Sequence, residues 1–578
     1  MLANIKCPII TLKIGEQMSN SNKTYLIIGV IVILIIAGGY YMLSRPTEPT
    51  EPTDGEEPEP IVYRSTWAWP TRIDPAVGSD GSSQAAIPNL YNSLVRITPT
   101  GEVGPELAES WTVSNGGLTY TFVLREGVMS HSGNEITSED VVYSMDRFLT
   151  IGEGLAYLFL PYIGDTTAVD TYTVQIDLLK PFGPILTVMP NFYVLDMDAV
   201  MENVAEGEYG ELGDYGKEWL MTHDAGSGPY MVQDFLLEEK LVMEKFEGYW
   251  GEEMQVEGHM FIENSPDIVE MIGTTEPITV RTMMSRGELE RTDSWQPIEN
   301  LEEMEQIEGV EMVGEVGSSL LNLMMHTRKA PTDDVHFRRA IAYAFDYDTA
   351  VTDIFPYTTL VKGVENEVLP GYDPDIEPFR RDLDKAMAEL EQSAYYDQLE
   401  DIELEIHWCA EVPAEERISL LFLDNMADLG INVKIVKEPW LSMIDTMADM
   451  DTSPNIVVVY NSVHFPEAGG DLMRYHSESA PTWEQNEWLL DDALDQLIED
   501  ALGTVDQEER FQKYGEIQEY LYDQCPTVYV LQTTTLRCIQ DNIVYPNIVY
   551  GEQVSGFVYK IPLGFRAFYG LYTGITPR

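Results

Sequence analysis

Apolar and polar residues alternate early in the body of the chain, which predicts β-strands. One strand is expected at 61–69, where the residues sharing a face are Ile61, Tyr63, Ser65, Trp67 and Trp69. Pro70 must end this strand, because proline has no N–H group to donate to a sheet. A second strand is expected at 118–124, directly after the turn residues Asn115–Gly117.

Apolar residues spaced three and four positions apart predict helices elsewhere. Thr137 and Asp140 form the acidic variant of a capping box, so a helix is expected to begin there. Its apolar stripe consists of Val141, Val142, Met145, Phe148 and Leu149. A longer helix is expected at 413–430, ended by Gly430, because glycine readily adopts the left-handed conformation common after a helix.

Strands and helices alternate regularly in the second half of the chain. The expected order is strand 402–409, helix 413–430, strand 431–436, helix 441–450 and strand 455–461. Such an order is typical of a parallel sheet with right-handed crossover connections. Periodicity alone therefore predicts one α/β lobe.

Residues 24–44 form an apolar run without a charged residue, long enough to cross a bilayer. Three lysines precede the run, so the positive-inside rule predicts a cytoplasmic segment at 1–23 and an extracellular body. The run is expected to be a transmembrane anchor, with a cleaved signal peptide as the alternative, because 37–39 resembles a cleavage site. Met1 and Met18 are both candidates for the start of the protein.

Five prolines and six acidic residues lie within 45–60. Proline fixes φ and like charges repel, so an extended segment is favoured over a helix. We interpret this segment as a stalk. Residues 61–578 follow it and are too many for a single hydrophobic core, which predicts two or three lobes.

The chain is strongly acidic, with 98 acidic against 34 basic residues and a formal net charge of −64. Such a surface repels nucleic acid, so we expect no nucleic-acid partner. Concentrated salt would screen the self-repulsion, which suggests a saline habitat. An acidic extracellular protein in ordinary surroundings is the alternative.

Cysteines and motifs give little sign of a metal site or of catalysis. Cys525 and Cys538 would be able to form a disulfide in an oxidising exterior. There is no C-x-x-C pair to suggest a thiolate zinc site, and none of the common hydrolase, phosphate-loop or dinucleotide motifs is present. We therefore predict no cofactor, no metal and no catalytic residue.

Several segments, in the same order, resemble the extracytoplasmic solute-binding proteins of ABC importers, in the dipeptide- and oligopeptide-binding family (family 5). These segments are 90–148, 226–235, 247–251, 323–348, 383–395 and 554–572. The resemblance implies an α/β fold of the type II periplasmic-binding-protein class. It has two lobes, a hinge, a ligand cleft and a smaller inserted domain.

The resemblance also implies domain boundaries. The first lobe would be formed by 61–98, 223–320 and the closing segment 526–578. The inserted small domain would span 99–222, and the second lobe 321–525.

The implied function is a membrane-tethered, monomeric extracellular receptor. It would capture a peptide-like solute between its lobes and deliver it to an ABC permease, with a separate ATPase subunit. An oligosaccharide-binding or metal-chelate-binding protein of the same importer class is the alternative. A chemosensory binding protein and an anchored hydrolase are further alternatives.

Candidate ligand-binding residues follow from the family's loop, which reads like G-W-x-A-D-Y-P-D-P and is matched by 460–468. Asn461 stands at the position of the loop's Trp, His464 at that of the amine-binding Asp, and Glu467 at that of the second Asp. A neutral His cannot supply the ion pair that an ammonium group requires, so Glu467 is a candidate replacement. The full predicted ligand-binding set is Trp67, Trp69, Trp408, Trp440, Asn461, Ser462, His464 and Glu467. For each Trp, and for His464, a purely structural role is equally open.

Overall fold

The computed structural model describes most of the chain beyond residue 58. The described residues are 59–67, 72–79, 81–98, 102–237, 239–274, 276–294, 296–410, 412–480, 482–544, 559–561 and 574–576. The chain divides into two compact units, Met1–Glu59 and Pro60–Arg578, and the second contains the elements below. The predicted anchor and nearly all of the stalk lie outside the described residues. Within those residues, no helix has the length and apolar character needed to cross a membrane.

The first sheet has four strands in the order β1-β10-β9-β8. Their bounds are β1 (Val62–Trp67), β10 (Ile268–Gly273), β9 (Lys240–Lys245) and β8 (Tyr230–Leu236). β1 runs parallel to β10, and the other pairs are antiparallel. β1 is the strand predicted from alternation, and Tyr63 and Ser65 on its inward face are buried. Helix α2 (Gly81–Leu90) follows β1.

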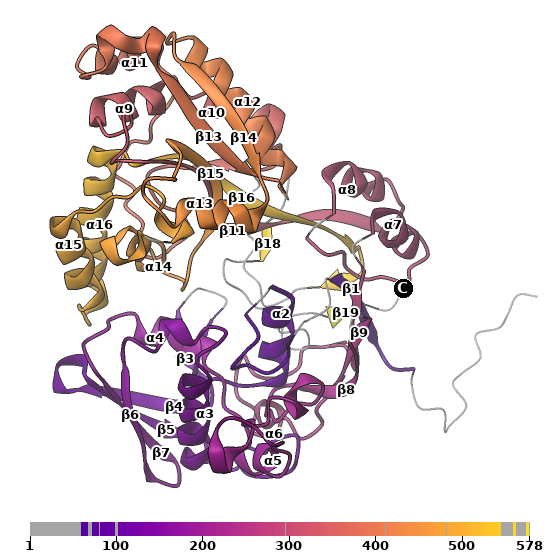
Figure 1. Cartoon of the computed structure of the whole chain (residues 1–578). Helices are drawn as coiled ribbons and strands as arrows, with labels where there is room; N and C mark the ends of the chain where they lie inside the picture. Colours follow the sequence, from indigo (N-terminus) through magenta and orange to yellow (C-terminus); the bar gives the residue numbers. More distant parts are fainter. Residues whose placement is uncertain are drawn as a thin grey trace, which may run out of the picture. The chain divides into compact units, whose positions relative to one another are not determined.

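The segment between the first and later parts of this sheet forms an antiparallel sheet of its own, in the order β4-β5-β7-β6. Its strands are β4 (Ala108–Ser114), β5 (Thr119–Leu124), β7 (Thr173–Leu178) and β6 (Ile163–Asp170). Helix α3 (Ser138–Ile151) lies against β6 and β7 (Figure 1). The predicted capping box is confirmed, since Asp140 accepts hydrogen bonds from the N–H and hydroxyl groups of Thr137.

The largest sheet has the order β12-β16-β11-β15-β13-β14, with β18 beside β11. The strands are β12 (Thr359–Leu360), β16 (Thr527–Gln540), β11 (Val310–Met325), β15 (Ile456–Ser462), β13 (Glu403–Cys409), β14 (Asn432–Glu438) and β18 (Tyr559–Ile561). β13 is parallel to both β14 and β15, as predicted. The sheet as a whole is mixed, because β15, β11, β16 and β12 pair in antiparallel fashion.

Helices α12 (Pro413–Ala427) and α13 (Trp440–Met447) connect the parallel strands, as expected. The inward stripe of α12, Ile418, Phe422 and Met426, is buried against the sheet. Gly430 follows the helix with φ +73°, in the left-handed region predicted for it. The parallel part of this sheet, with its two connecting helices, was therefore predictable from periodicity.

Four short strands form two small antiparallel sheets, β2 with β3 and β17 with β19, and the remaining helices lie beside the larger sheets (Figure 1). The short strands are β2 (Val95–Ile97), β3 (Val103–Pro105), β17 (Ile543–Val544) and β19 (Gly574–Ile575). The helices are α4 (Ile185–Val188), α5 (Met197–Met201), α6 (Trp250–Glu253), α7 (Pro277–Ser285), α8 (Ile298–Glu305), α9 (Val335–Ala344), α10 (Tyr347–Thr349), α11 (Leu383–Leu390), α14 (Gly469–Leu472), α15 (Asp492–Leu502) and α16 (Gln507–Gln524).

Two long strands, β11 and β16, connect the first sheet to the largest one. Arg291 forms β-bridges both to Ser65 in β1 and to Ile539 near the end of β16. The pairing of β11 with β16 is irregular between Val316 and Leu320. A pair of strands shared by two lobes, with a break in register, is suited to act as a hinge.

Cys525 and Cys538 do not form the disulfide that the sequence allowed, because both are free and buried. Cys525 precedes β16 and Cys538 lies near its far end, so the extended strand separates them by roughly 40 Å. Burial raises the pKa of each thiol to about 12. They behave as small core residues.

Candidate functional site

The predicted ligand loop leaves the end of β15, whose buried valines fix it in the centre of the largest sheet. Asn461 is itself buried, and its Oδ1 accepts a hydrogen bond from Nδ2 of Asn322 in β11 at 3.0 Å. The hydroxyl oxygens of Ser462 and Ser319 lie 2.6 Å apart. These two residues therefore hold the start of the loop against the hinge strand.

His464 contacts Tyr157, a residue of the segment that precedes β6. Its Nδ1 is 2.8 Å from the hydroxyl oxygen of Tyr157, and the two rings meet edge to face. Its Nε2 is 3.3 Å from Oε2 of Glu484. Burial acts to raise the pKa of Glu484, yet that pKa is lowered, because His464 hydrogen-bonds and attracts the carboxylate. A charged carboxylate thus lies directly beside His464.

Glu467 is buried and fully engaged within the protein. Its carboxylate receives Nε and Nη2 of Arg510 at 3.1 and 3.0 Å, and the hydroxyl of Tyr514 at 2.8 Å. Burial acts to lower the pKa of Arg510, but the pairing with Glu467 raises it. Glu467 therefore ties the loop to α16, and its contacts leave it poorly suited to replace the missing Asp.

The four predicted tryptophans fall in different surroundings. Trp408 is buried in the apolar core of the second lobe, with the ammonium of Lys437 4.9 Å from its ring centre. Trp440 is half-buried and meets Trp483 edge to face, with ring centres 5.3 Å apart. The backbone of Trp67 ends β1, but its side chain, like all of Trp69, lies outside what the structure describes.

Trp440 and His464 therefore lie near each other, because Trp440 contacts Trp483 and His464 contacts the next residue, Glu484. Trp408 lies apart from this group, in the core. We call Tyr157, Trp440, His464, Trp483 and Glu484 the His464 cluster. It offers an aromatic pair, a carboxylate, an imidazole and a phenol, contributed by segments far apart in the sequence.

Further contacts join the inserted segment to the second lobe beside this cluster. Phe182 and Phe465 meet edge to face, with ring centres 6.1 Å apart. The N–H of Gly183 donates to the carbonyl of Leu502 at 2.7 Å. A Cβ on Gly183 would lie only 1.9 Å from the carbonyl oxygen of Thr504, so this close approach requires glycine.

Comparison with known proteins identifies the family. Residues 102–480 match the family model of bacterial extracellular solute-binding proteins, family 5 Middle. The chain belongs to this family. The fold of the family, two α/β lobes with a hinge between them, agrees with the fold predicted from the sequence.

Individual relatives of this solute-binding family are distant but cover most of the chain. The probable D,D-dipeptide-binding periplasmic protein DdpA of Escherichia coli is 25% identical over 522 residues, covering 87% of this chain and 92% of that protein. Heme-binding protein A of Haemophilus influenzae is 24% identical over 544 residues, covering 88% and 92%. The solved periplasmic binding protein DppA of Helicobacter pylori, in complex with the peptide STSA, is 21% identical, with a TM-score of 0.67 and coverage of 90% and 99%.

Tyr157, Trp483 and Glu484 were not predicted from the sequence, because no motif marks them. Tyr157 is distant from His464 in the sequence, and Trp483 and Glu484 belong to a separate short helix. Glu415 was not predicted either; it is buried at the start of α12 and accepts the N–H of Cys409 at 2.8 Å. Burial raises the pKa of Glu415 to about 8. Cys409 ends β13, and open α/β sheets bind ligands beyond the carboxyl ends of their strands. The position of Glu415 shortly after the predicted strand 402–409 was the one sequence signal that pointed to it.

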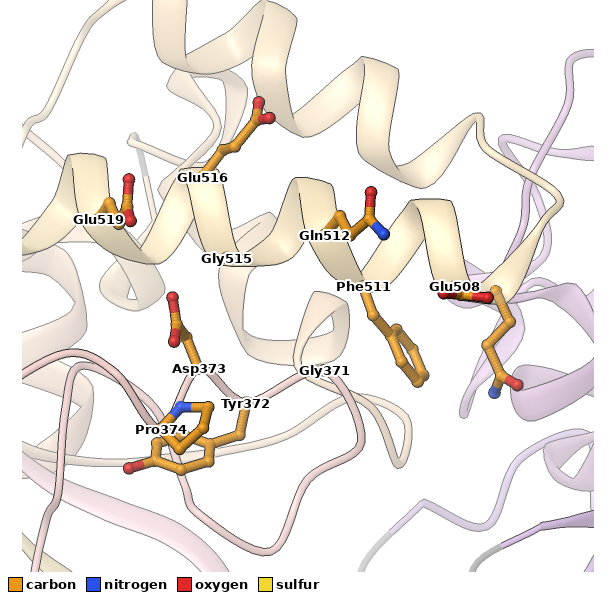
Figure 2. Close-up of a pocket in the computed structure, with 11 residues that line it drawn as sticks. Gly371, Tyr372, Asp373, Pro374, Glu508, Phe511, Gln512, Gly515, Glu516 and Glu519 are labelled. Atoms are coloured by element: carbon orange, nitrogen blue, oxygen red, sulfur yellow. The ribbon is translucent and has the colours of Figure 1, made fainter.

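Two cavities lie outside the predicted site. One, of about 560 Å³, lies between α16 and the loop 371–374, where Phe511, Tyr372 and several carboxylates surround the opening (Figure 2). The other, of about 410 Å³, is lined by residues that include Arg72, Asp74 and Lys217. Of the predicted ligand-binding residues whose side chains the structure describes, none lines either cavity. Within the described part of the chain, no group of three or more His, Cys, Asp or Glu side chains is placed to hold a metal ion.

Proposed function

We propose that this protein is a membrane-tethered extracellular receptor that captures a peptide-like solute between its lobes and delivers it to an ABC permease. The observation that carries the proposal is the match of 102–480 to the solute-binding family. The apolar run at 24–44 and the stalk at 45–60 support the tether. A tether would keep the receptor close to its permease and raise its effective concentration there.

Capture would proceed by closure about β11 and β16. A closed form is favoured only by the free energy of contacts that the solute makes with both lobes. The His464 cluster supports this mechanism, because Tyr157 comes from the inserted segment and the other four residues from the second lobe. The chain has no phosphate-binding loop, so ATP would be hydrolysed by a separate subunit.

A peptide is the favoured solute. Two of the relatives above are a D,D-dipeptide-binding protein and a protein solved with a bound peptide. A free peptide carries an ammonium group, which needs a carboxylate. Glu484, beside His464, is a better candidate for this contact than Glu467, whose oxygens already receive Arg510 and Tyr514.

An oligosaccharide or a chelate is the second candidate. The edge-to-face pair of Trp440 and Trp483 presents flat apolar surface of the kind that carbohydrate or macrocyclic faces contact. One relative is a heme-binding protein, so cargo varies among proteins similar to this chain.

Thermal unfolding of the full-length chain, with a panel of added solutes, tests the proposal. The panel contains di- to pentapeptides, the same peptides N-acetylated, oligosaccharides and metal chelates. A solute that binds only the folded form stabilises it by about 2.7 kcal/mol at 100 times its Kd. We expect free peptides to raise the midpoint and acetylated peptides to raise it less. A rise with sugars or chelates alone would contradict the peptide assignment, and no rise with any solute would contradict solute capture of these classes.

A further inference from the structure

A buried cluster of three carboxylates and one guanidinium lies directly behind the ligand loop. Its members are Glu365, Asp471, Arg474 and Glu487, each at most 4% exposed. Arg474 donates from Nε to Oδ1 of Asp471 at 3.2 Å and from Nη1 to Oε1 of Glu487 at 3.1 Å. Three carboxylates against one cation would leave two uncompensated negative charges in the interior, which is costly.

Three carboxylate oxygens of this cluster have no hydrogen-bond donor, and one of them is Oε2 of Glu487, whose Oε1 receives Arg474 and the hydroxyl of Thr527. Oε2 of Glu365 and Oδ2 of Asp471 are both buried and unpartnered, and the two carboxyl groups interact with each other. Arg474 is committed to Asp471 and Glu487. The other titratable groups here, the hydroxyls of Tyr475 and Tyr529, bond to one another at 2.7 Å. Two carboxyl groups in contact cannot both be ionised in the protein interior, and a proton held between them supplies the missing donor.

We propose that Glu365 and Asp471 share one buried proton, and that this proton holds the segment 361–371 against the loop that follows β15. The bond that forms is O–H···O between the two carboxyl groups, and the proton comes from and returns to solvent. Glu487 and Arg474 complete the charge balance, leaving the cluster with a net charge of about −1.

The position of the pair gives the proton a structural consequence. Asp471 lies in α14, just after the ligand loop, and the N–H of Ala468 donates to the carbonyl of Pro370 at 2.9 Å. On the other side, Nδ2 of Asn366 donates to the carbonyl of Gly317 at 3.0 Å, within the irregular part of hinge strand β11. Loss of the proton would place two like charges between the loop and the segment that contacts the hinge.

The sign of the pH dependence follows from Glu365. Burial raises the pKa of this group, and the charge of Asp471 raises it further, against an opposing effect of Arg474. The unfolded chain loses this proton near its ordinary pKa of about 4.3, whereas the folded chain retains it to higher pH. The stability that this proton contributes is therefore fully present below the pKa of the unfolded chain and is lost as pH rises through the pKa of the folded chain. Between these two pKa values, the unfolding equilibrium constant changes about tenfold per pH unit.

The decisive variant is Glu365→Gln in the full-length chain. Its amide donates permanently to Asp471, so it reproduces the protonated pair at every pH. Urea unfolding would be measured from pH 5 to 9 for this variant, for the wild type and for Glu367→Gln, a partly exposed neighbour that pairs with Lys362. We expect wild type and Glu367→Gln to lose stability with rising pH and Glu365→Gln to lose clearly less. Parallel pH profiles for all three proteins would overturn the proposal.

Two measurements keep the proposal testable if Glu365→Gln does not fold. Infrared spectra of Glu415→Gln, which removes another buried carboxyl group, one whose pKa burial raises to about 8, should still contain the C=O band of a protonated carboxyl group at neutral pH, which disappears on alkaline titration. Amide hydrogen exchange of Gly470 and Asp471, whose N–H groups bond within the loop, should be faster at high pH than the intrinsic pH effect predicts. Absence of a protonated carboxyl band at neutral pH would overturn the shared proton. Ordinary exchange in the loop would overturn its coupling to the loop.

Discussion

At the scale of single residues, the ligand loop is held by a charge pair of its own. The carboxylate of Glu467 receives two donors from Arg510 and one from Tyr514, and all three groups are buried. Forming such a pair adds little net stability, because both ions lose their hydration. Removing one partner strongly destabilises the fold, because the other charge is then left buried and unpaired.

We therefore expect Glu467→Gln to destabilise the protein by about 3–5 kcal/mol. Urea unfolding without added solute measures this, separately from any role in binding. Glu509→Gln is the matched control, because Glu509 is exposed and pairs with Lys513 across one helical turn. The control should stay within about 0.5 kcal/mol of the wild type. If Glu467→Gln unfolded like the control, Arg510 would not depend on Glu467 for its charge balance.

At the scale of elements, one glycine in helix α16 lowers the stability of the folded protein. Gly515 lies in the middle of this helix, where glycine costs conformational entropy relative to alanine. A Cβ there would meet only the side chain of Asp373, with Oδ2 at 3.3 Å and Cγ at 3.9 Å, and this side chain lines the cavity in Figure 2. Asp373 is a side chain that can shift, so the added methyl group has room.

Gly515→Ala is accordingly expected to stabilise the protein by about 0.5–1 kcal/mol. Gly469→Ala is the contrasting variant, because its Cβ would lie 2.2 Å from the hydroxyl oxygen of the buried Tyr514. Thermal unfolding of both variants decides the point. A midpoint raised by Gly515→Ala and lowered by Gly469→Ala supports this packing around α16 and Tyr514. A fall for Gly515→Ala would mean that Asp373 cannot move.

Helices and strands with a clear periodic spacing of apolar residues were predictable from the sequence, and those without such spacing were not. The stripe of α12 and the alternation before Cys409 revealed one strand and one helix correctly. The hinge strands β11 and β16 were not predicted, because 314–319 and 533–535 are rich in Gly, Ser and Thr and show no alternation of apolar and polar residues. Their pairing depends on contacts between residues more than 200 positions apart, such as Thr533 with Ser319, which no local pattern encodes.

The site was predictable only along one stretch of chain. His464 and Glu467 were found because they are close together in a loop of recognisable form. The roles of their side chains were not, since the partners Tyr157, Glu484 and Arg510 come from distant segments. A sequence states which groups are available, whereas burial and distant partners decide which of them stay free to meet a solute.

At the scale of the whole molecule, the charge dominates. With a formal charge of −64, the folded chain repels itself, and this repulsion is relieved on unfolding because the charges move apart. Salt screens it over a Debye length of about 30 Å at 0.01 M, about 8 Å at 0.15 M and about 3 Å at 1 M. The salt concentration at which stability stops rising therefore reports the distance over which the repulsion acts.

We expect the midpoint of thermal unfolding to rise between about 0.01 M and about 1 M NaCl, because added salt shortens the range of the repulsion. Choline chloride at matched ionic strength is the control, because screening depends on ionic strength and not on the cation. Equal curves in the two salts support screening, and a flat curve in both would contradict self-repulsion. A plateau near 0.15 M would favour an ordinary acidic extracellular protein. A rise that continues to 1 M would show repulsion between adjacent surface acids, at distances that only concentrated salt screens, and would favour the saline habitat.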